Sequence, residues 1–303
     1  SFGRSVAMTD NWIVVGAYLK AFIFKKNKTD DTWDTTAAFT LDKNTEYNHF
    51  GISVAMTNNW IVVGTESGGN KAFIFKKNNM DDTWGTTAAF ILDQNTADLY
   101  FGGHSSVAMT NNWIIVGANG ANKAFIFKKN NTDDTWDTTA AYTLDKNTVD
   151  SGFGRSVAMT NNWIVIGTKY VDRANKAFIF KKNNTDDTWD TTAAFTLDKN
   201  TADNGFGQSV AMTNNWIIVA AYYPNNPNKA FMFKKNNMDD TWGTTAAFIL
   251  DQNTADNHFG YSLAITNTNG AVVGVRNPTN KVFSSFHRNC AIGSFNNAWD
   301  EEC

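Results

Sequence analysis

Residues 153–168 read FGRSVAMTNNWIVIGT and residues 175–205 read NKAFIFKKNNTDDTWDTTAAFTLDKNTADNG, and this pair of segments recurs along the chain. Its opening Phe-Gly returns at intervals of 48, 51, 52, 53 and 53 residues, starting at Phe2, Phe50, Phe101, Phe153, Phe206 and Phe259. Self-similarity at a nearly fixed period is the signature of a repeat architecture. We therefore expect one domain over residues 1–303, built from six units: 2–49, 50–100, 101–152, 153–205, 206–258 and 259–303.

Each unit holds four short apolar runs, which in the first unit are SVAMT, WIVVG, KAFIFKK and TTAAFTL, near Ser5, Trp12, Lys20 and Thr35. Runs of this length between turn residues predict β-strands. The Asn-Asn link between the first two runs predicts a hairpin, because Asn tolerates left-handed backbone conformations. Strands that are apolar on both faces suit packing between neighbouring sheets. The sequence thus predicts an all-β fold, a six-bladed β-propeller of four-stranded antiparallel blades.

The sixth unit is atypical. Its three predicted strands cover Tyr261–Thr266, Ala271–Val275 and Lys281–His287, and the fourth run is replaced by a segment bounded by Cys290 and Cys303. These cysteines suit one disulfide that closes a short loop, and two free thiols are the alternative. Three ways of closing the ring remain open: an outer strand over Ala291–Phe295, an edge from residues outside this sequence, or a strand donated by another copy.

Composition and motifs exclude several classes of function. The 26 Lys and Arg residues against 29 Asp and Glu give a net charge of −3, so nucleic acid is not an expected partner. The longest apolar run, Trp216–Tyr223, is far shorter than the roughly 20 residues of a membrane-spanning helix, and we expect no membrane insertion. No nucleophile elbow, zinc-protease motif or P-loop is present, and the four histidines lie in different units. We therefore expect no enzyme and no catalytic residue.

The recurring FGxSVAMT, the following WIVVGA and AFIF strands and the Trp before AAFTL resemble the FG-GAP repeat of extracellular propellers, over about residues 1–286. The resemblance implies a propeller related to the head of integrin α-subunits and a secreted or cell-surface location. It also implies a non-enzymatic structural or adhesive module within a larger surface or filamentous assembly, with other proteins or further copies of itself as partners. The calcium loop of integrin-type repeats is not matched, because the first link is only Asn58-Asn59 or its equivalents.

An aromatic position next to acidic residues favours a second function, a multivalent lectin with one carbohydrate site per blade. A ring face beside polar groups is typical of sugar sites. The candidate residues are Trp33, Trp84, Trp136, Trp189 and Trp242, with Asp34, Asp137 and Asp190. Packing between blades explains the same recurrence. The Trp residues that begin the second run, such as Trp12 and Trp60, are predicted to pack.

Two further patterns involve polar side chains. Asp198, Asn200 and Asp203 could supply oxygen ligands to calcium, although an Asx-stabilised turn explains the same spacing, so no cofactor is predicted beyond this candidate. N-glycosylation sequons begin at Asn27, Asn130 and Asn183, at one repeat position, and are expected to be used if the protein is secreted. Such sequons also arise by chance in an Asn- and Thr-rich chain.

Length variation is concentrated in the link between the second and third runs, from Ala17-Tyr18-Leu19 in the first unit to residues 220–228 in the fifth. Because insertions belong in exposed loops, we expect these links to share one variable rim of the disc. Neutral drift is the alternative explanation. The Lys-Lys and Asp-Asp pairs of each unit, such as Lys128-Lys129 and Asp133-Asp134, are predicted to meet within and between units as surface ion pairs.

Overall fold

The protein is all-β, as predicted. The computed structural model describes residues 2–42, 49–66, 70–93, 100–103, 106–145, 152–168, 176–198, 205–221, 228–251, 259–266, 270–275 and 282–285. Six antiparallel sheets account for the strands in these ranges, and none of these ranges holds a helix. Among the described residues there is accordingly no helical segment that could cross a membrane.

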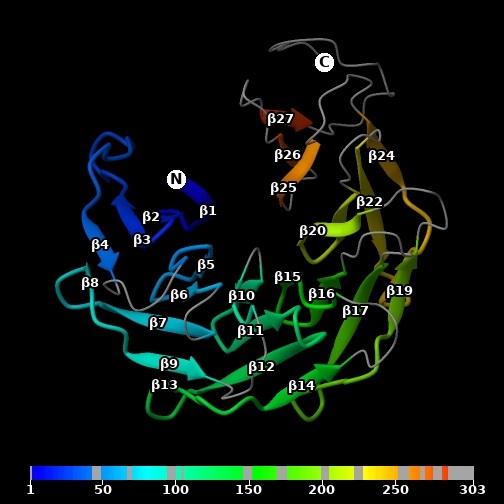
Figure 1. The fold of residues 1–303 in the computed structure, drawn as a ribbon, viewed down its shortest axis with the longest axis horizontal. Helices are drawn as coiled ribbons and strands as arrows, with labels where there is room; N and C mark the ends of the chain where they lie inside the picture. The colour runs from blue at the N-terminus through cyan, green and yellow to red at the C-terminus, as the bar shows by residue number, and fades with distance from the viewer. Residues whose placement is uncertain are drawn as a thin grey trace.

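The sheets follow one another as the blades of a propeller, arranged around a common centre with the first strand of each blade innermost (Figure 1). The strands of blades 1 to 3 are β1 (Phe2–Met8), β2 (Trp12–Ala17), β3 (Lys20–Lys25) and β4 (Phe39–Asp42); β5 (Ser53–Met56), β6 (Trp60–Gly64), β7 (Lys71–Asn78), β8 (Thr83–Trp84) and β9 (Phe90–Asp93); and β10 (Val107–Met109), β11 (Trp113–Ala118), β12 (Lys123–Asn130), β13 (Thr135–Trp136) and β14 (Tyr142–Asp145).

Blades 4 and 5 repeat this plan and blade 6 shortens it. Their strands are β15 (Ser156–Met159), β16 (Trp163–Gly167), β17 (Lys176–Asn183), β18 (Thr188–Trp189) and β19 (Phe195–Asp198); β20 (Phe206–Met212), β21 (Trp216–Ala221), β22 (Lys229–Asn236), β23 (Thr241–Trp242) and β24 (Phe248–Asp251); and β25 (Phe259–Ile265), β26 (Ala271–Val275) and β27 (Val282–Ser285). The three strands predicted for the sixth unit are thus present. The proposed outer strand at 291–295 and both cysteines lie outside the described residues.

Two local details differ from the sequence prediction. The fourth run forms a strand only over its last residues, because the preceding Thr-Trp pair first adds a short strand to the end of the third one, as β13 does on β12. The hairpin at Asn161-Asn162 forms without left-handed residues: the Thr160 hydroxyl accepts hydrogen bonds from the backbone N–H groups of Asn162 and Trp163. The left-handed positions lie instead at the second Asp of each Asp-Asp pair, such as Asp134 with φ 56°.

Antiparallel order gives the disc two chemically distinct faces. In blade 3, Met109, Trp113 and Lys129 lie at the end of the sheet that carries both hairpins, which we call the hairpin face. Ala118, Lys123 and Asp145 lie at the opposite end, with the link between the second and third strands and the connections between blades. We call this end the link face. The links of variable length therefore share one face, as predicted.

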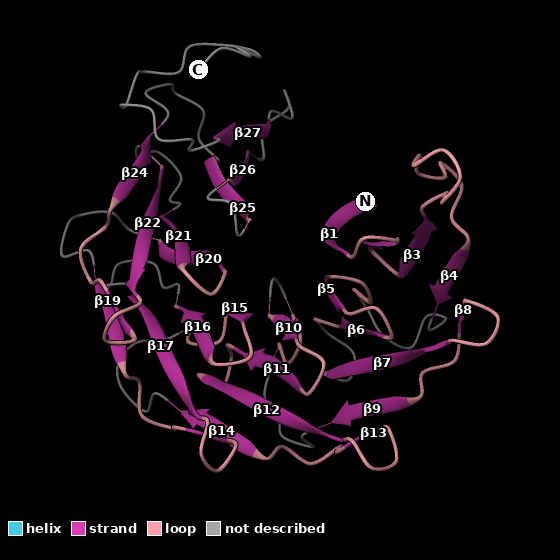
Figure 2. Cartoon of the chain, turned by 180° about the vertical axis from the view of Figure 1, so that it is seen from behind, coloured by secondary structure: helices cyan, strands magenta, loops and turns pink. Residues whose placement is uncertain are grey.

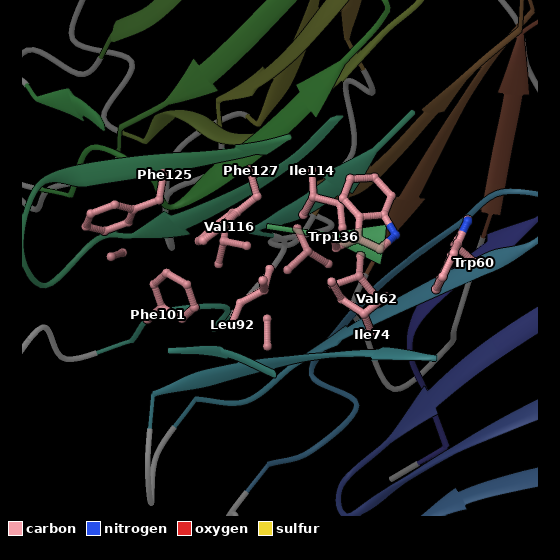
Figure 3. Close-up of a cluster of buried hydrophobic side chains, with 13 residues drawn as sticks. Trp60, Val62, Ile74, Leu92, Phe101, Ile114, Val116, Phe125, Phe127 and Trp136 are labelled. Carbon is pink, nitrogen blue, oxygen red and sulfur yellow. The ribbon is translucent and has the colours of Figure 1, made fainter. Parts of the chain in front are cut away.

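The hydrophobic core lies between consecutive blades (Figure 3). Val62, Ile74 and Leu92 of blade 2 meet Phe101 and Phe125 of blade 3 in one cluster, and equivalent clusters join the other neighbours. The Trp that begins each full second strand is buried, which confirms its predicted packing role: Trp12, Trp60, Trp113, Trp163 and Trp216.

The Phe-Gly motif recurs because its glycine has left-handed geometry and touches the preceding blade. Gly102 has φ +78°, a conformation that residues with a Cβ rarely adopt. A Cβ added to Gly64 of the preceding blade would lie 2.1 Å from the Gly102 carbonyl oxygen. Both glycines are therefore required by the close approach of two backbones.

The two ends of the arc differ from its interior. β1 and the strands β25 to β27 stand apart when the molecule is seen from either side (Figures 1 and 2). Phe2 is 64% exposed, whereas its equivalent Phe206 in β20 is fully buried. The first strand therefore has the sequence of an interior strand without the cover that the interior strands receive.

Candidate functional site

The five recurring Trp residues predicted as sugar platforms lie between blades. Trp136 is 3% exposed and meets Trp60 of the preceding blade edge-on, with ring centroids 6.0 Å apart. The same burial and geometry recur at Trp84, Trp189 and Trp242. Trp33 is half-buried, and Lys26 Nζ lies 5.9 Å from its ring centroid. This placement favours packing over sugar binding, because the ring faces that a sugar would need are covered.

The acidic partners predicted for these platforms point away from a common site. Asp34, Asp137 and Asp190 are exposed, and each donates its backbone N–H to a carbonyl oxygen of the third strand. Gly85 and Gly243 make the same backbone bond in the other two units. The carboxylate is therefore not needed for this turn.

The other predicted polar sites lie at exposed turns or outside the described residues. Asn27, Asn130 and Asn183 are exposed at hairpin tips, where each side-chain oxygen accepts the backbone N–H two residues ahead. Their glycosylation stays a prediction. Of the calcium candidates, Asp198 lies 3.9 Å from Lys176, and Asn200 and Asp203 are not described. Within the described ranges, no group of three or more His, Cys, Asp or Glu side chains could hold a metal ion.

Ion pairs on the hairpin face join neighbouring blades. Asp187 pairs with Lys182 of its own blade at 2.7 Å and with Lys128 of the preceding blade at 3.0 Å. The same arrangement recurs at Asp82, Asp134 and Asp240. Burial raises the pKa of Asp187, but the hydrogen bonds from the two lysines outweigh it, so the pKa lies below its ordinary value. The ion pairs of the hairpin face thus connect each of blades 2 to 5 to the blade before it.

The link face is where the units differ, close to the centre of the disc. The residue after each Phe-Gly lies inside the innermost strand in blades 1, 5 and 6 and shortly before it in blades 2, 3 and 4, and it changes from blade to blade while the following SVAM is nearly constant. This position holds Arg4, Ile52, Gly103, Arg155, Gln208 and Tyr261. Side chains around the centre of one face are well placed to bind a common ligand.

A histidine and a carboxylate pair on this face. His49 Nδ1 lies 2.6 Å from Glu66 Oε2, and the Glu66 side chain is mostly buried. The Tyr18 ring lies against the imidazole, with centroids 4.5 Å apart. His49 directly precedes the Phe-Gly of blade 2, and Tyr18 and Glu66 come from the second links of blades 1 and 2. The carboxylate and the Tyr ring fix the orientation of the imidazole.

A guanidinium of blade 4, that of Arg155, lies within electrostatic reach of the Glu66 carboxylate. Arg155 Nε donates to Gln208 Oε1 at 3.2 Å, across the boundary between blades 4 and 5. Burial lowers the pKa of Arg155, and the nearby Tyr261 and Glu66 oppose that shift electrostatically. An Arg side chain stays charged in proteins. We call His49, Glu66, Arg155 and Gln208 the hub cluster.

Backbone strain marks the same place. His49 has φ 66°, and the equivalent residues in blades 4 and 5 are Gly152 and Gly205, with φ 92° and 94°. Tyr100 of blade 3 shares the strained geometry, with φ 76°. A residue with a Cβ is disfavoured in this region by about 1–2 kcal/mol. Because the same left-handed geometry recurs before Phe-Gly in blades 3, 4 and 5, it belongs to the connection between blades, and His49 is a residue that adopts it without being glycine.

The sequence interpretation did not identify the hub cluster, since it treated the histidines as isolated residues in different units. Its members are 159 residues apart at most, and none belongs to a local motif. A signal was present in the position after Phe-Gly. Comparing the six copies column by column singles it out as a variable position beside constant ones.

The chain is similar in fold to solved structures of low sequence identity. No family model matches this chain, and no curated protein matches it either. A solved structure described as a "putative 6-phosphogluconolactonase" from Bacteroides uniformis superposes with a TM-score of 0.64 at 10% identity, over 93% of this chain and 84% of that one. One of the same description from Bacteroides fragilis gives 0.61 at 11% identity, over 93% and 82%. A Lactobacillus plantarum protein gives 0.57 at 12% identity, over 91% and 82%.

These neighbours correct two predictions. The resemblance to FG-GAP repeats is wrong as a family assignment, because no family model matches and the similar structures bear the name of a different propeller family. The non-enzymatic adhesive function, for which we expected no enzyme, is wrong together with its lectin alternative, because two of the neighbours are described as 6-phosphogluconolactonases. At 10–12% identity the likeness establishes the fold only.

Proposed function

We propose that this protein is a hydrolase that opens lactones of sugar acids at the hub cluster. The observation that carries the proposal is the His49–Glu66 pair on the face that also presents the half-buried Arg155. The description of two structural neighbours as 6-phosphogluconolactonases supports the choice of substrate class. A general base and a fixed positive charge are two groups that each accelerate ester hydrolysis.

His49 serves as the general base. With its Nδ1–H donating to Glu66, the imidazole presents Nε2 as an acceptor, which is the role such a pair has in other hydrolases. Nε2 takes a proton from water while the water oxygen bonds to the lactone carbonyl carbon. The carbonyl oxygen becomes an oxyanion. When the ring C–O bond breaks, the proton passes from His49 to the departing oxygen, and the product is the open hydroxy acid.

Arg155 supplies positive charge to the substrate or to the oxyanion. Its hydrogen bond to Gln208 holds the guanidinium in place, so little reorganisation is needed when negative charge develops. Its burial strengthens the electrostatic effect, because charges interact more strongly away from water. The same guanidinium could instead bind a phosphate group on the substrate.

The test is the rate of lactone opening above the spontaneous rate, measured by the acid released at constant pH. We expect hydrolysis of 6-phosphogluconolactone by the native chain, and a loss of about 100-fold or more in Arg155→Met and Glu66→Gln. Arg4→Met is the matched control, because Arg4 occupies the same repeat position but is exposed. Equal losses at Arg4 and Arg155, or no rate above the buffer blank with 6-phosphogluconolactone and gluconolactone, would refute the proposal.

A further inference from the structure

Blade 1 presents an apolar face whose equivalents are covered in blades 2 to 5. This open face consists of Phe2, Val6, Phe22, Phe24 and Trp33. Phe2 and Val6 are 64% and 58% exposed, while Phe50 and Val54 at the same positions in blade 2 are 1% and 8% exposed. Contiguous exposed apolar surface of this kind marks interaction sites.

The open face already has the geometry of a covered one. The Phe2 ring lies 5.7 Å from the Phe22 ring and 6.2 Å from the Phe24 ring. The buried equivalents in blade 2, Phe50 with Phe73 and Phe75, show the same 5.7 and 6.2 Å. The side chains of the open face are therefore already ordered, so binding to them costs little conformational entropy.

The four interfaces between blades 1 to 5 show what kind of surface covers such a face. Trp12, Val14 and Ile23 of blade 1 pack onto the equivalent face of blade 2. Trp12 meets Trp84 edge-on, with centroids 6.0 Å apart, and Lys77 Nζ lies 5.6 Å from the Trp12 ring centroid. The complement of the open face is thus a sheet whose second strand begins with Trp.

The ion pairs between neighbouring blades indicate the same kind of covering sheet. Asp82, Asp134, Asp187 and Asp240 each pair with a lysine of the preceding blade, and their side chains are 33–47% exposed. Asp31 at the same position of blade 1 pairs with Lys26 of its own blade and is 86% exposed. A covering sheet with a lysine at the position of Lys25 would complete this ion pair.

Blade 6 does not have this complement. Gly270 stands where the other blades have the packing Trp, since its carbonyl accepts from Thr266 as that of Trp12 accepts from Thr9. In the register of the next strands, Val272 faces Ser284 where blade 1 pairs Val14 with Ile23. Blade 6 is therefore less apolar than blade 1 at the positions that pack against a following blade.

We propose that the open face binds one further four-stranded unit of this repeat, which presents a Trp-bearing face and lies outside residues 1–303. The 303 residues contain no seventh such unit, because each Trp-Ile run within them already belongs to one of the five full blades. The structural neighbours agree in size: this chain covers 84% and 82% of the two described as lactonases, which leaves about one blade's length of chain in each.

The experiment supplies this unit. The sequence of residues 153–205 replaces Ser1, so that its Gly205 directly precedes Phe2 as it precedes Phe206 in the native chain. Hydroxyl-radical footprinting then measures the modification rates of Phe2 and Trp33. We expect both rates to fall about fivefold, as for residues that pass from open to buried, and the thermal midpoint to rise.

The matched control carries the same added unit with the change W163G in that copy, which reproduces the Gly of blade 6. It is expected to leave Phe2 and Trp33 as reactive as in the native chain. Equal protection by both units, or by neither, would overturn the proposal. So would a native chain that dimerises in light scattering with Phe2 and Trp33 protected, because a second copy would then be the occupant.

Discussion

The hairpin face and the link face of the disc are built from the same repeats, but the residues of the hairpin face are nearly constant between blades and those of the link face vary. On the hairpin face the four interfaces between blades 1 to 5 repeat one arrangement, in which a Trp meets a Trp edge-on and an Asp joins two lysines. On the link face the equivalent positions differ, and His49, Glu66 and Arg155 come from different units. Constant residues hold blades to blades, and variable residues are available for a ligand.

The two faces therefore predict two kinds of mutant. A change on the hairpin face should lower stability and leave the chemistry of the folded protein intact. A change on the link face should remove activity and leave stability unchanged, or even raise it where the backbone is strained. Three experiments test this separation.

The largest effect on stability is expected for a hairpin-face tryptophan. Trp136→Ala empties a buried site against Trp60, and truncations of this kind cost about 3–5 kcal/mol. Trp33→Ala is the matched variant in the uncovered blade, where the same side chain is half-buried, and it should cost clearly less. Urea unfolding measures both free energies. Equal costs would show that the blade interfaces do not hold the fold as described.

Repetition explains why the fold was easier to predict than the site. The Trp of the second strand is buried in all five full blades, and in blades 1 to 4 it meets the same neighbours, so one interpretation of WIVVG applies to each copy. The burial of Trp136 could not be predicted from the sequence alone, because a recurring surface residue and a recurring packing residue give the same pattern. Only the position of the neighbouring blade distinguishes them.

The hub cluster could not be predicted by the same reasoning. His49, Glu66 and Arg155 occupy unlike positions in units far apart along the chain, and only closure of the sheets around a centre brings them to one face. The strain at His49 was also hidden, because the residue before Phe-Gly is not always Gly. Differences among nearly identical copies were the available signal.

An intermediate effect is expected at His49, where activity should fall far more than stability. His49→Gly removes the general base and should lower lactone hydrolysis to the spontaneous rate. The same change relieves a left-handed backbone, but it also removes the partner of the mostly buried Glu66, so the two effects on stability, each about 1–2 kcal/mol, oppose one another. Tyr100→Gly relieves the equivalent strain in blade 3 and should keep full activity. A His49→Gly variant that stays active would remove His49 from the mechanism.

The smallest effect is expected from the ion pairs of the hairpin face. Burial raises the pKa of Asp134, but hydrogen bonds from Lys129 and Lys76 outweigh it, so the folded pKa lies below the unfolded value near 3.9. A lowered folded pKa contributes stability above the unfolded pKa, and this contribution is lost as the pH falls through the folded pKa. Asp134→Asn should therefore cost up to about 1 kcal/mol at pH 7, because the pair is half-exposed. The difference from the native chain should vanish at strongly acidic pH. Asp31→Asn, in the blade that lacks a preceding neighbour, should change stability less at either pH, and urea unfolding at pH 7 and at acidic pH compares the two. If Asp31→Asn cost as much as Asp134→Asn at pH 7, the lysine of the preceding blade would not be what stabilises these carboxylates.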